Sequence, residues 1–221
     1  MKNIEIIKIP CVGYECNCFL IKIKNNAVLV DCGINFQTIQ KTLHNNNINL
    51  THVILTHGHY DHISSLTEIE KQYPEAEIII SEEDSEFLKR NNHFNLAQSL
   101  FKIDFQGAYF TKLIKENCTL TILDNKFEFF LTPGHTNGSM IICFNNNMFT
   151  GDSVFNLSVG RCDFPSGDYA KQKRSIEFIK NHFCQDYILY CGHGENSTLN
   201  FEKQYNPYFN PNSPYEDLFE H

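Results

Sequence analysis

The chain contains the stretch T-H-G-H-Y-D-H at residues 56–62, directly after the hydrophobic run V-I-L at 53–55. This position joins a predicted strand at 52–56 to a predicted helix at 63–72. Four possible metal ligands lie within six residues: His57, His59, Asp61 and His62. With ten histidines and ten aspartates in 221 residues, chance produces this pattern in roughly one chain in a thousand. This stretch is therefore the strongest chemical signal in the sequence.

Metal binding explains why three histidines stand so close together. Three imidazoles repel one another if all are protonated, whereas a metal ion binds their neutral form together with an ionised carboxylate. His57 and His59 alternate on an extended segment, so we expect both side chains to point the same way. Asp61 and His62 lie past the turn, at the entry to the predicted helix. A second ion about 3.5–4 Å from the first therefore becomes possible, as in two-metal hydrolytic sites.

Three further candidate ligands each follow a predicted strand and stand beside a glycine. His135 lies in T-P-G-H-T at 132–136, Asp152 in T-G-D at 150–152, and His193 in G-H-G at 192–194. Glycine lets the backbone turn sharply, so side chains from several loops can converge on one ion. Each of these signals is weak alone, but together with the first stretch they predict one metal site.

The apolar pattern predicts strands in two groups, each followed by helices. The first group has strands at 4–9, 18–23, 27–31, 52–56 and 77–81, with helices at 36–44, 63–72 and 82–90. The second group has strands at 119–123, 126–132, 139–144, 147–150 and 187–190, with a helix at 169–182. Residues 91–116 show no clear periodicity of apolar residues, so no secondary structure is predicted for them. Mostly antiparallel strands in this order indicate two sheets packed face to face with helices outside.

Composition narrows the classes of protein that fit. The formal net charge is −8 and no Lys/Arg-rich block occurs, so we expect no nucleic-acid partner. No apolar run approaches the roughly 18 residues of a membrane helix, and residues 1–10 read as a first strand, so we expect neither a membrane partner nor an export signal. The nine cysteines are odd in number and irregularly spaced, which favours reduced thiols in a cytoplasmic protein. Cys16 and Cys18 are predicted to be buried packing residues.

Taken together, these motifs resemble the metallo-β-lactamase superfamily of metal-dependent hydrolases, over roughly residues 4 to 207. Within it, G-R-C-D-F-P at 160–165, G-D at 167–168, G-E-N-S-T at 194–198 and N-P at 206–207 resemble the short glyoxalase II-like (hydroxyacylglutathione hydrolase-like) branch. The resemblance implies an α+β fold, a four-layer αβ/βα sandwich of two mainly antiparallel sheets with helices on the outer faces. We expect residues 1–221 to form this single domain, with an irregular, Pro-rich C-terminal tail at 207–221.

The resemblance also implies two metal ions and assigns their ligands. His57, His59 and His135 would hold the first ion, Asp61, His62 and His193 the second, and Asp152 would bridge them. Diiron oxygen-reducing relatives typically have glutamate where this chain has His59, so a hydrolase with two zinc ions is favoured. Nitrogen and oxygen ligands would also accept iron or manganese. Cys191 stands where the family commonly has proline, and we interpret it as a packing residue.

The hypothesis for the reaction is hydrolysis of a small acyl thioester, such as a hydroxyacylglutathione-like compound. Two cations that share one water lower its pKa to about 7, which supplies a bridging hydroxide as the nucleophile. A thiol with a pKa of about 8.5 leaves as thiolate, whereas an amide would need a proton from Asp61 or a water. Arg161 is a candidate ligand for a substrate carboxylate, and pairing with Asp163 is the alternative.

Other functions share parts of this pattern. Persulfide dioxygenases resemble the chain in the histidine cluster and the G-R-x-D-F segment, but use one iron, which His57, His135 and Asp152 would bind. Hydrolases of lactones, other esters, β-lactams or phosphodiesters share much of the ligand set. A non-catalytic module with a structural metal is the remaining alternative, although structural zinc sites are usually closed and rich in thiolates. Metal identity, stoichiometry and turnover separate these functions.

Overall fold

The computed structural model describes residues 4–13, 15–90 and 92–215. Within them the chain divides into two compact units, Met1–Lys115 and Glu116–His221, and each unit contains one six-stranded sheet. None of the helices in the described part has the length and apolarity that crossing a membrane requires.

The first unit is built on a sheet of order β1-β2-β3-β4-β5-β6. Its strands are β1 (Ile4–Ile9), β2 (Cys18–Ile23), β3 (Asn26–Val30), β4 (Asn49–Ile54), β5 (Glu77–Ser81) and β6 (Lys112–Ile114). The β1–β2 and β2–β3 pairs are antiparallel, whereas β3–β4, β4–β5 and β5–β6 are parallel. The prediction of a mainly antiparallel sheet is therefore wrong here, and the sheet is mixed. Two parallel neighbouring strands need a crossover connection between them, and the helical segments after β3 and after β4 supply these connections.

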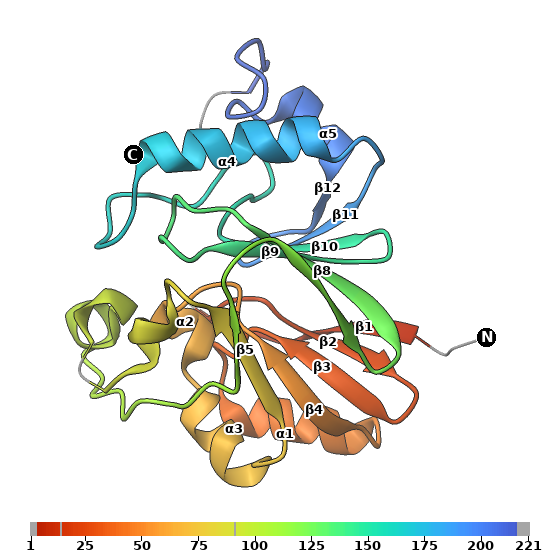
Figure 1. Ribbon diagram of the computed structural model, residues 1–221, viewed down its shortest axis with the longest axis vertical. Helices are drawn as coiled ribbons and strands as arrows, with labels where there is room; N and C mark the ends of the chain where they lie inside the picture. Colours follow the sequence, from red (N-terminus) through yellow and green to blue (C-terminus); the bar gives the residue numbers. More distant parts are fainter. Residues whose placement is uncertain (1–3, 14, 91, 216–221) are drawn as a thin grey trace. The chain divides into compact units, whose positions relative to one another are not determined.

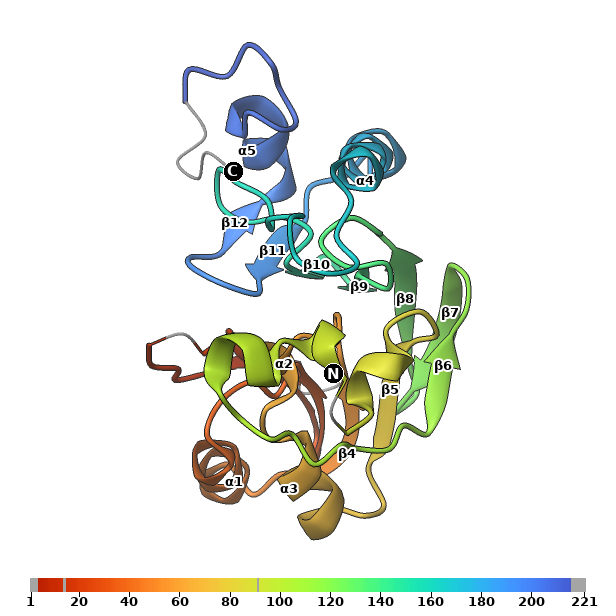
Figure 2. The same ribbon diagram turned by 90° about the vertical axis from the view of Figure 1, so that its left-hand side faces the viewer.

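Helices α1 (Phe36–Asn45) and α3 (Leu66–Gln72) form those crossovers and cover one face of the first sheet (Figures 1 and 2). Ile39 and Leu43 of α1 and Leu66 and Ile69 of α3 are buried in one apolar cluster with strand residues such as Leu29. Burial of each such side chain contributes about 1.5–3 kcal/mol. The C-terminal ends of β3 and β4 therefore lie on a firmly packed base, and the segment that follows β4 carries the candidate ligands of this unit.

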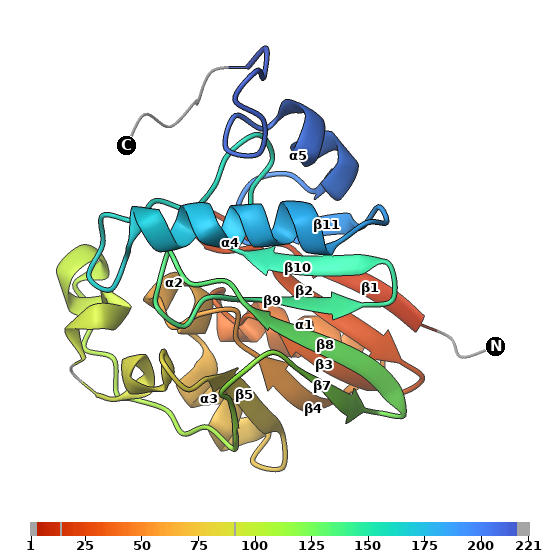
Figure 3. The ribbon, with the colours of Figure 1, turned by 45° about the horizontal axis from the view of Figure 1, so that its top comes forward.

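The second unit is built on a sheet of order β12-β11-β10-β9-β8-β7. Its strands are β7 (Cys118–Ile122), β8 (Asn125–Leu131), β9 (Met140–Phe144), β10 (Asn147–Gly151), β11 (Ile188–Cys191) and β12 (Ser197–Thr198). All pairs except β10–β11 are antiparallel, as predicted. Helix α4 (Tyr169–His182) connects β10 to β11 and lies along one face of the sheet (Figure 3). Its Ile176 and Ile179 pack in a cluster with Leu189.

Several elements differ from the predictions because of local geometry. The helix predicted at 63–72 is two helices, α2 (Tyr60–Ile63) and α3, and the helix predicted at 82–90 is a single 3-10 turn, η1 (Ser85–Leu88). Residues 91–116, for which no structure was predicted, contain the short helical turns η2 (His93–Asn95) and η3 (Ala97–Phe101) as well as β6; residue 91 is outside the described residues. Helix α5 (Leu199–Tyr205) and the two-residue strand β12 were not predicted.

The C-terminal segment is irregular where it is described. Residues 207–215 form turns and bends, and residues 216–221 of the predicted tail lie outside the described residues. Phe209 in this segment is buried in the apolar cluster of the second unit, so the segment is attached to the core rather than lying wholly on the surface.

Candidate metal centre

The T-H-G-H-Y-D-H stretch lies in the loop after β4 and in the short helix α2. His57, His59 and His62 are buried, whereas the side chain of Asp61 is 21% exposed. The ring centroids of His57 and His59 are 4.8 Å apart, and those of His57 and His62 are 4.1 Å apart. The nearer oxygen of Asp61 lies 4.0 Å from Nε2 of His62. The first unit thus brings all four of its candidate ligands together.

Two neighbouring side chains fix the orientation of these imidazoles. Asp31 Oδ2 accepts hydrogen bonds from Nδ1 of His62 and from Oγ1 of Thr56, both at 2.8 Å, and Asp31 Oδ1 accepts from the backbone N–H of Thr56. Because the Thr56 hydroxyl proton points to Asp31, its oxygen accepts from Nδ1 of His57, at 3.2 Å. In both histidines the proton is then on Nδ1, so Nε2 carries the lone pair that a metal ion requires.

Sequence reasoning missed the role of Asp31. The residue was assigned to the end of a predicted strand, but it follows β3 with a positive φ of 56°, so its carboxylate turns toward the ligand loop. The available signal was a carboxylate directly after a run of buried apolar residues, which needs partners if it is buried. Asp31 is 2% exposed, and its hydrogen bonds to Thr56 and His62 supply those partners.

The neighbouring thiols confirm the interpretation of Cys16 and Cys18 as packing residues. Both are fully buried, and their Sγ atoms are 3.5 Å apart. Ligand atoms of Cys16, Asp31 and His62 lie within 4.8 Å of one another. Burial raises the pKa of the Cys16 thiol well above its ordinary value, so the thiol is neutral. All nine cysteines lie within the described residues and are thiols rather than disulfides.

The second unit presents His135, Asp152 and His193, each just after a strand. Nε2 of His135 and Nε2 of His193 lie 3.4 Å and 3.8 Å from Oδ2 of Asp152. Ligands that bind one ion at about 2.0–2.2 Å each have donor atoms separated by such distances. Nδ1 of His135 donates to the backbone carbonyl of Arg161 at 2.7 Å, which again directs Nε2 toward the carboxylate. The second unit therefore brings its three candidate ligands together as well.

Gln172 connects the loops that carry His135 and Asp152, and sequence reasoning missed it. Its side-chain oxygen accepts the backbone N–H of His135 at 3.1 Å, and its side-chain nitrogen donates to the carbonyl of Ser153 at 2.9 Å. Helix α4 approaches so closely that a Cβ on Gly134 would lie 2.4 Å from Cα of Gln172. The signal was a polar residue on the buried face of a predicted helix, four residues before Ile176.

Arg161 and Cys191 have identifiable neighbours in the second unit. Arg161 donates from Nε and Nη2 to the two carboxylate oxygens of Asp163, at 2.6 and 2.5 Å, and its guanidinium lies 4.4 Å from the ring centre of Phe164. The pairing with Asp163 raises the pKa of Arg161.

Cys191 is fully buried, and burial raises the pKa of its thiol to about 12, which agrees with a packing role.

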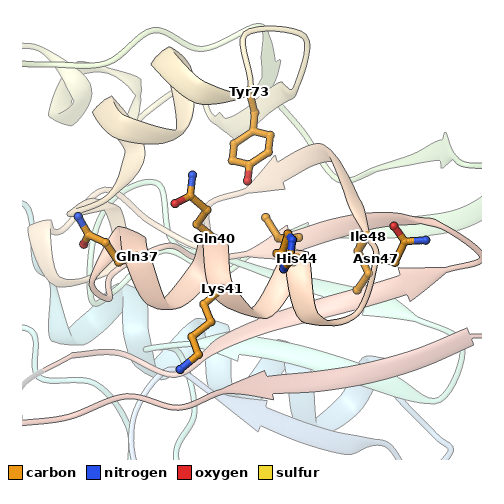
Figure 4. Close-up of a pocket in the computed structure, with 8 residues that line it drawn as sticks. Gln37, Gln40, Lys41, His44, Asn47, Ile48 and Tyr73 are labelled. Atoms are coloured by element: carbon orange, nitrogen blue, oxygen red, sulfur yellow. The ribbon is translucent and has the colours of Figure 1, made fainter.

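Two grooves open on the first unit. One, of about 590 Å³, lies along α1 and is lined by Gln37, Lys41, His44 and Tyr73 among others (Figure 4). None of the candidate ligands lines it. The other, of about 470 Å³, includes Tyr60, which stands between His59 and Asp61, together with the apolar side chains of Phe36, Phe101 and Ile103. The second groove therefore adjoins the ligand loop.

Comparison with known proteins gives the family. The metallo-beta-lactamase superfamily model matches residues 12–193. The chain belongs to the metallo-β-lactamase superfamily. One relative is the hydroxyacylglutathione hydrolase GloC of Haemophilus influenzae. It is 32% identical to this chain over 215 residues, which cover 96% of this chain and 100% of that protein. The glyoxalase II-like branch of this superfamily, expected from the motifs, is thereby confirmed.

Solved structures agree on the metallo-β-lactamase fold. The B3 metallo-beta-lactamase BLEG-1 matches with a TM-score of 0.87 and 24% identity over 93% of this chain and 99% of that chain. TTHA1623, crystallised in a di-iron-bound form, matches with a TM-score of 0.78 and 21% identity over 91% of this chain and 99% of that chain. The expected α+β metallo-β-lactamase fold is confirmed.

Proposed function

We propose that this superfamily member is a hydrolase that holds two zinc ions and cleaves a small acyl thioester of the hydroxyacylglutathione type. In this proposal the two units are the halves of one metallo-β-lactamase-type domain, residues 1–221. As the family resemblance implies, the proposal assigns the ligands of both units to one binuclear centre, in which Asp152 would be the shared ligand. The similarity to GloC over nearly the whole chain supports the substrate class.

The observation that carries the proposal is the uniform orientation of the imidazoles. His57, His62 and His135 each use Nδ1 in a hydrogen bond to the protein, to Thr56, Asp31 and the carbonyl of Arg161 respectively. Each therefore presents Nε2 as the ligand atom, as metal-binding histidines with an oriented ring do. The proposed donor set has five imidazoles and two carboxylates and no thiolate, which is typical of catalytic rather than structural zinc sites. The residues thus fit the metal that the family implies.

Two zinc ions at these ligands would supply a hydroxide nucleophile at neutral pH and polarise the thioester carbonyl. The thiol leaves as thiolate, so no further acid is required from the protein. We assign Asp152 and Asp61 as the catalytic carboxylates, Asp152 because its Oδ2 lies near both His135 and His193, and Asp61 because its partly exposed side chain lies near His62. The groove beside Tyr60, which has both apolar and polar side chains in its lining, offers room for the acyl group.

Arg161 remains our proposed contact for an anionic part of the substrate. Asp163 occupies the Nε/Nη2 edge of its guanidinium. A guanidinium has a second bidentate edge at Nη1/Nη2, which matches a carboxylate. The ion pair with Asp163 orients this second edge, so pairing and substrate binding are compatible.

The test is metal analysis of the purified protein by elemental mass spectrometry, paired with lactoylglutathione hydrolysis on the same sample. About two zinc ions per chain, with thioester cleavage that a chelator abolishes and zinc restores, is the expected result. His135→Ala should lose metal and activity together, whereas His44→Ala in the last turn of α1 should change neither.

Other results would replace parts of the proposal. Two metals without turnover of the thioester would overturn the substrate class. Two iron ions, as in the di-iron form of TTHA1623, would overturn zinc as the metal. Close to one iron per chain, with oxygen consumption on glutathione persulfide and no thioester cleavage, would overturn the hydrolase and establish the dioxygenase.

The proposal also includes the cellular compartment of the protein and its partners. Nine thiols without a disulfide suit a reducing compartment, so we propose the cytoplasm. A net charge of −8 disfavours association with nucleic acid or with an anionic membrane surface, so we propose a small-molecule substrate as the partner.

A further inference from the structure

Asp84 is a buried carboxylate that the proposed reaction does not use. It lies between β5 and the 3-10 turn η1, and it is fully buried. It occupies the N-cap position of η1, but its side chain makes no capping hydrogen bond. Instead, its Oδ2 accepts the backbone N–H of Gly58 at 2.9 Å. Gly58 is the residue between His57 and His59, so this carboxylate reaches from a different element to the centre of the ligand loop.

The turn that carries Asp84 also packs directly on that loop. A Cβ at Gly58 would lie 2.5 Å from Cβ of Phe87, so the contact exists only because residue 58 is glycine. The ring of Phe87 lies 6.0 Å from the ring of His59, tilted by 38°. One four-residue segment, from Asp84 to Phe87, therefore touches both the backbone between the two histidines and the ring of the second one.

The physical consequence follows from the flexibility of glycine. A Gly58 peptide without a fixed hydrogen bond could adopt many orientations, and each would turn the flanking imidazoles differently. A hydrogen bond from N–H to a charged carboxylate is about twice as strong as one between neutral groups, which makes Asp84 an effective anchor. A buried carboxylate is costly without compensating charge, and a cation bound at the adjacent imidazoles would lower that cost.

We propose that Asp84 is a positioning residue for the metal centre. Its carboxylate, by accepting the Gly58 N–H and by its charge, holds His57 and His59 in the arrangement that binds one ion. The inference rests on the proposed metal centre. Outer carboxylates that orient metal ligands typically contribute 10–100-fold to metal affinity, and we expect an effect of about that size here.

The experiment compares zinc dissociation constants, measured by chelator competition, for the wild type, Asp84→Ala and Asp84→Asn. We expect Asp84→Ala to raise the dissociation constant about 10–100-fold. Asp84→Asn should raise it less, because its amide oxygen still accepts the Gly58 N–H without the charge. The visible spectrum of the Co²⁺-substituted protein should change in both variants, which a role limited to folding would not produce. Asp186→Asn is the matched control, since Asp186 also accepts backbone N–H groups, from Tyr187 and Asn200.

The outcomes are distinguishable. If the wild type binds no metal, the proposed centre fails. If the wild type binds zinc and Asp84→Ala binds it equally tightly, with the same Co²⁺ spectrum, the role of Asp84 is overturned even if the melting temperature falls. If Asp84→Ala does not fold, the Asp84→Asn protein provides the test. A zinc dissociation constant and a Co²⁺ spectrum equal to those of the wild type would then overturn the inference. A zinc affinity that falls as much in Asp186→Asn would likewise overturn it, because the loss would then not be specific to the ligand loop.

Discussion

At the scale of single residues, the site is organised through the side of each imidazole that does not face the metal position. Asp31 is the clearest case, because one carboxylate holds both Thr56 and His62, and Thr56 in turn holds His57. A ligand histidine with a fixed Nδ1–H loses less rotational entropy when it binds an ion. The chemistry of the ligands therefore depends on residues that are not ligands.

Replacing Asp31 tests this dependence. Asp31→Ala should weaken zinc binding about 10–100-fold, because His62 loses its Nδ1 acceptor and Thr56 no longer directs its lone pair to His57. It should also destabilise the fold by about 1–3 kcal/mol for each buried donor left without a partner. Chelator competition and urea unfolding measure the two effects separately. Asp104→Ala, which removes an exposed partner of Arg90, is the control. A folded Asp31→Ala protein with wild-type zinc affinity would contradict the role.

Arg161 gives a second prediction at this scale. Its ion pair with Asp163 is about half exposed, so Arg161→Ala should cost no more than about 1 kcal/mol of stability. Its backbone carbonyl, which orients His135, is retained. We expect KM for an anionic thioester to rise more than kcat falls. Steady-state kinetics measure this, with Arg90→Ala, another exposed Arg–Asp pair, as control. An unchanged KM would remove Arg161 from substrate binding.

At the scale of elements, the candidate ligands lie in loops that follow strands and in the short helix α2, and neighbouring helices and turns hold these segments. The elements that supply the ligands were predictable, because strands β4, β8, β10 and β11 have clear apolar runs. The turn η1 was predicted as part of a helix at 82–90, where three glutamates among residues 82–86 favour helix. Contacts of Asp84 and Phe87 with Gly58 favour the tight turn instead, and such long-range contacts are not visible in local propensity.

Gln172 gives the prediction at this scale. Gln172→Leu keeps the size of the side chain but leaves the His135 N–H and the Ser153 carbonyl without their buried partner. We expect a loss of about 1–3 kcal/mol for each of the two groups, together with weaker zinc binding. Urea unfolding of the metal-free protein isolates the first effect. Gln204→Leu on the exposed side of α5 should stay within about 0.5 kcal/mol of wild type. Equal effects of the two substitutions would show that Gln172 does not connect the two loops.

At the scale of the whole molecule, metal binding and stability are linked. Any ion that binds the folded chain alone stabilises it, by about 2.7 kcal/mol when its free concentration is a hundred times the dissociation constant. For a chain of 221 residues this corresponds to a rise in Tm of about 5–11 °C. Calorimetry of the protein with excess chelator and with added zinc measures the difference. Asp152→Ala, which removes the proposed bridge, should show almost none of it. A Tm that zinc leaves unchanged in the wild type would contradict a metal centre within the fold.

The sequence by itself determined the family, the fold class and the identity of the candidate ligands. These follow from local patterns: the histidine stretch, the glycine-flanked ligands after strands, and the apolar runs that make those strands. The mixed first sheet was not predicted, because strand direction depends on where a crossover helix returns the chain rather than on the strand's own residues. The supporting residues Asp31, Asp84 and Gln172 were missed for the same reason. Each acts across 20 or more residues of sequence, on Thr56, Gly58 and His135, and only the folded backbone brings such partners within hydrogen-bond distance.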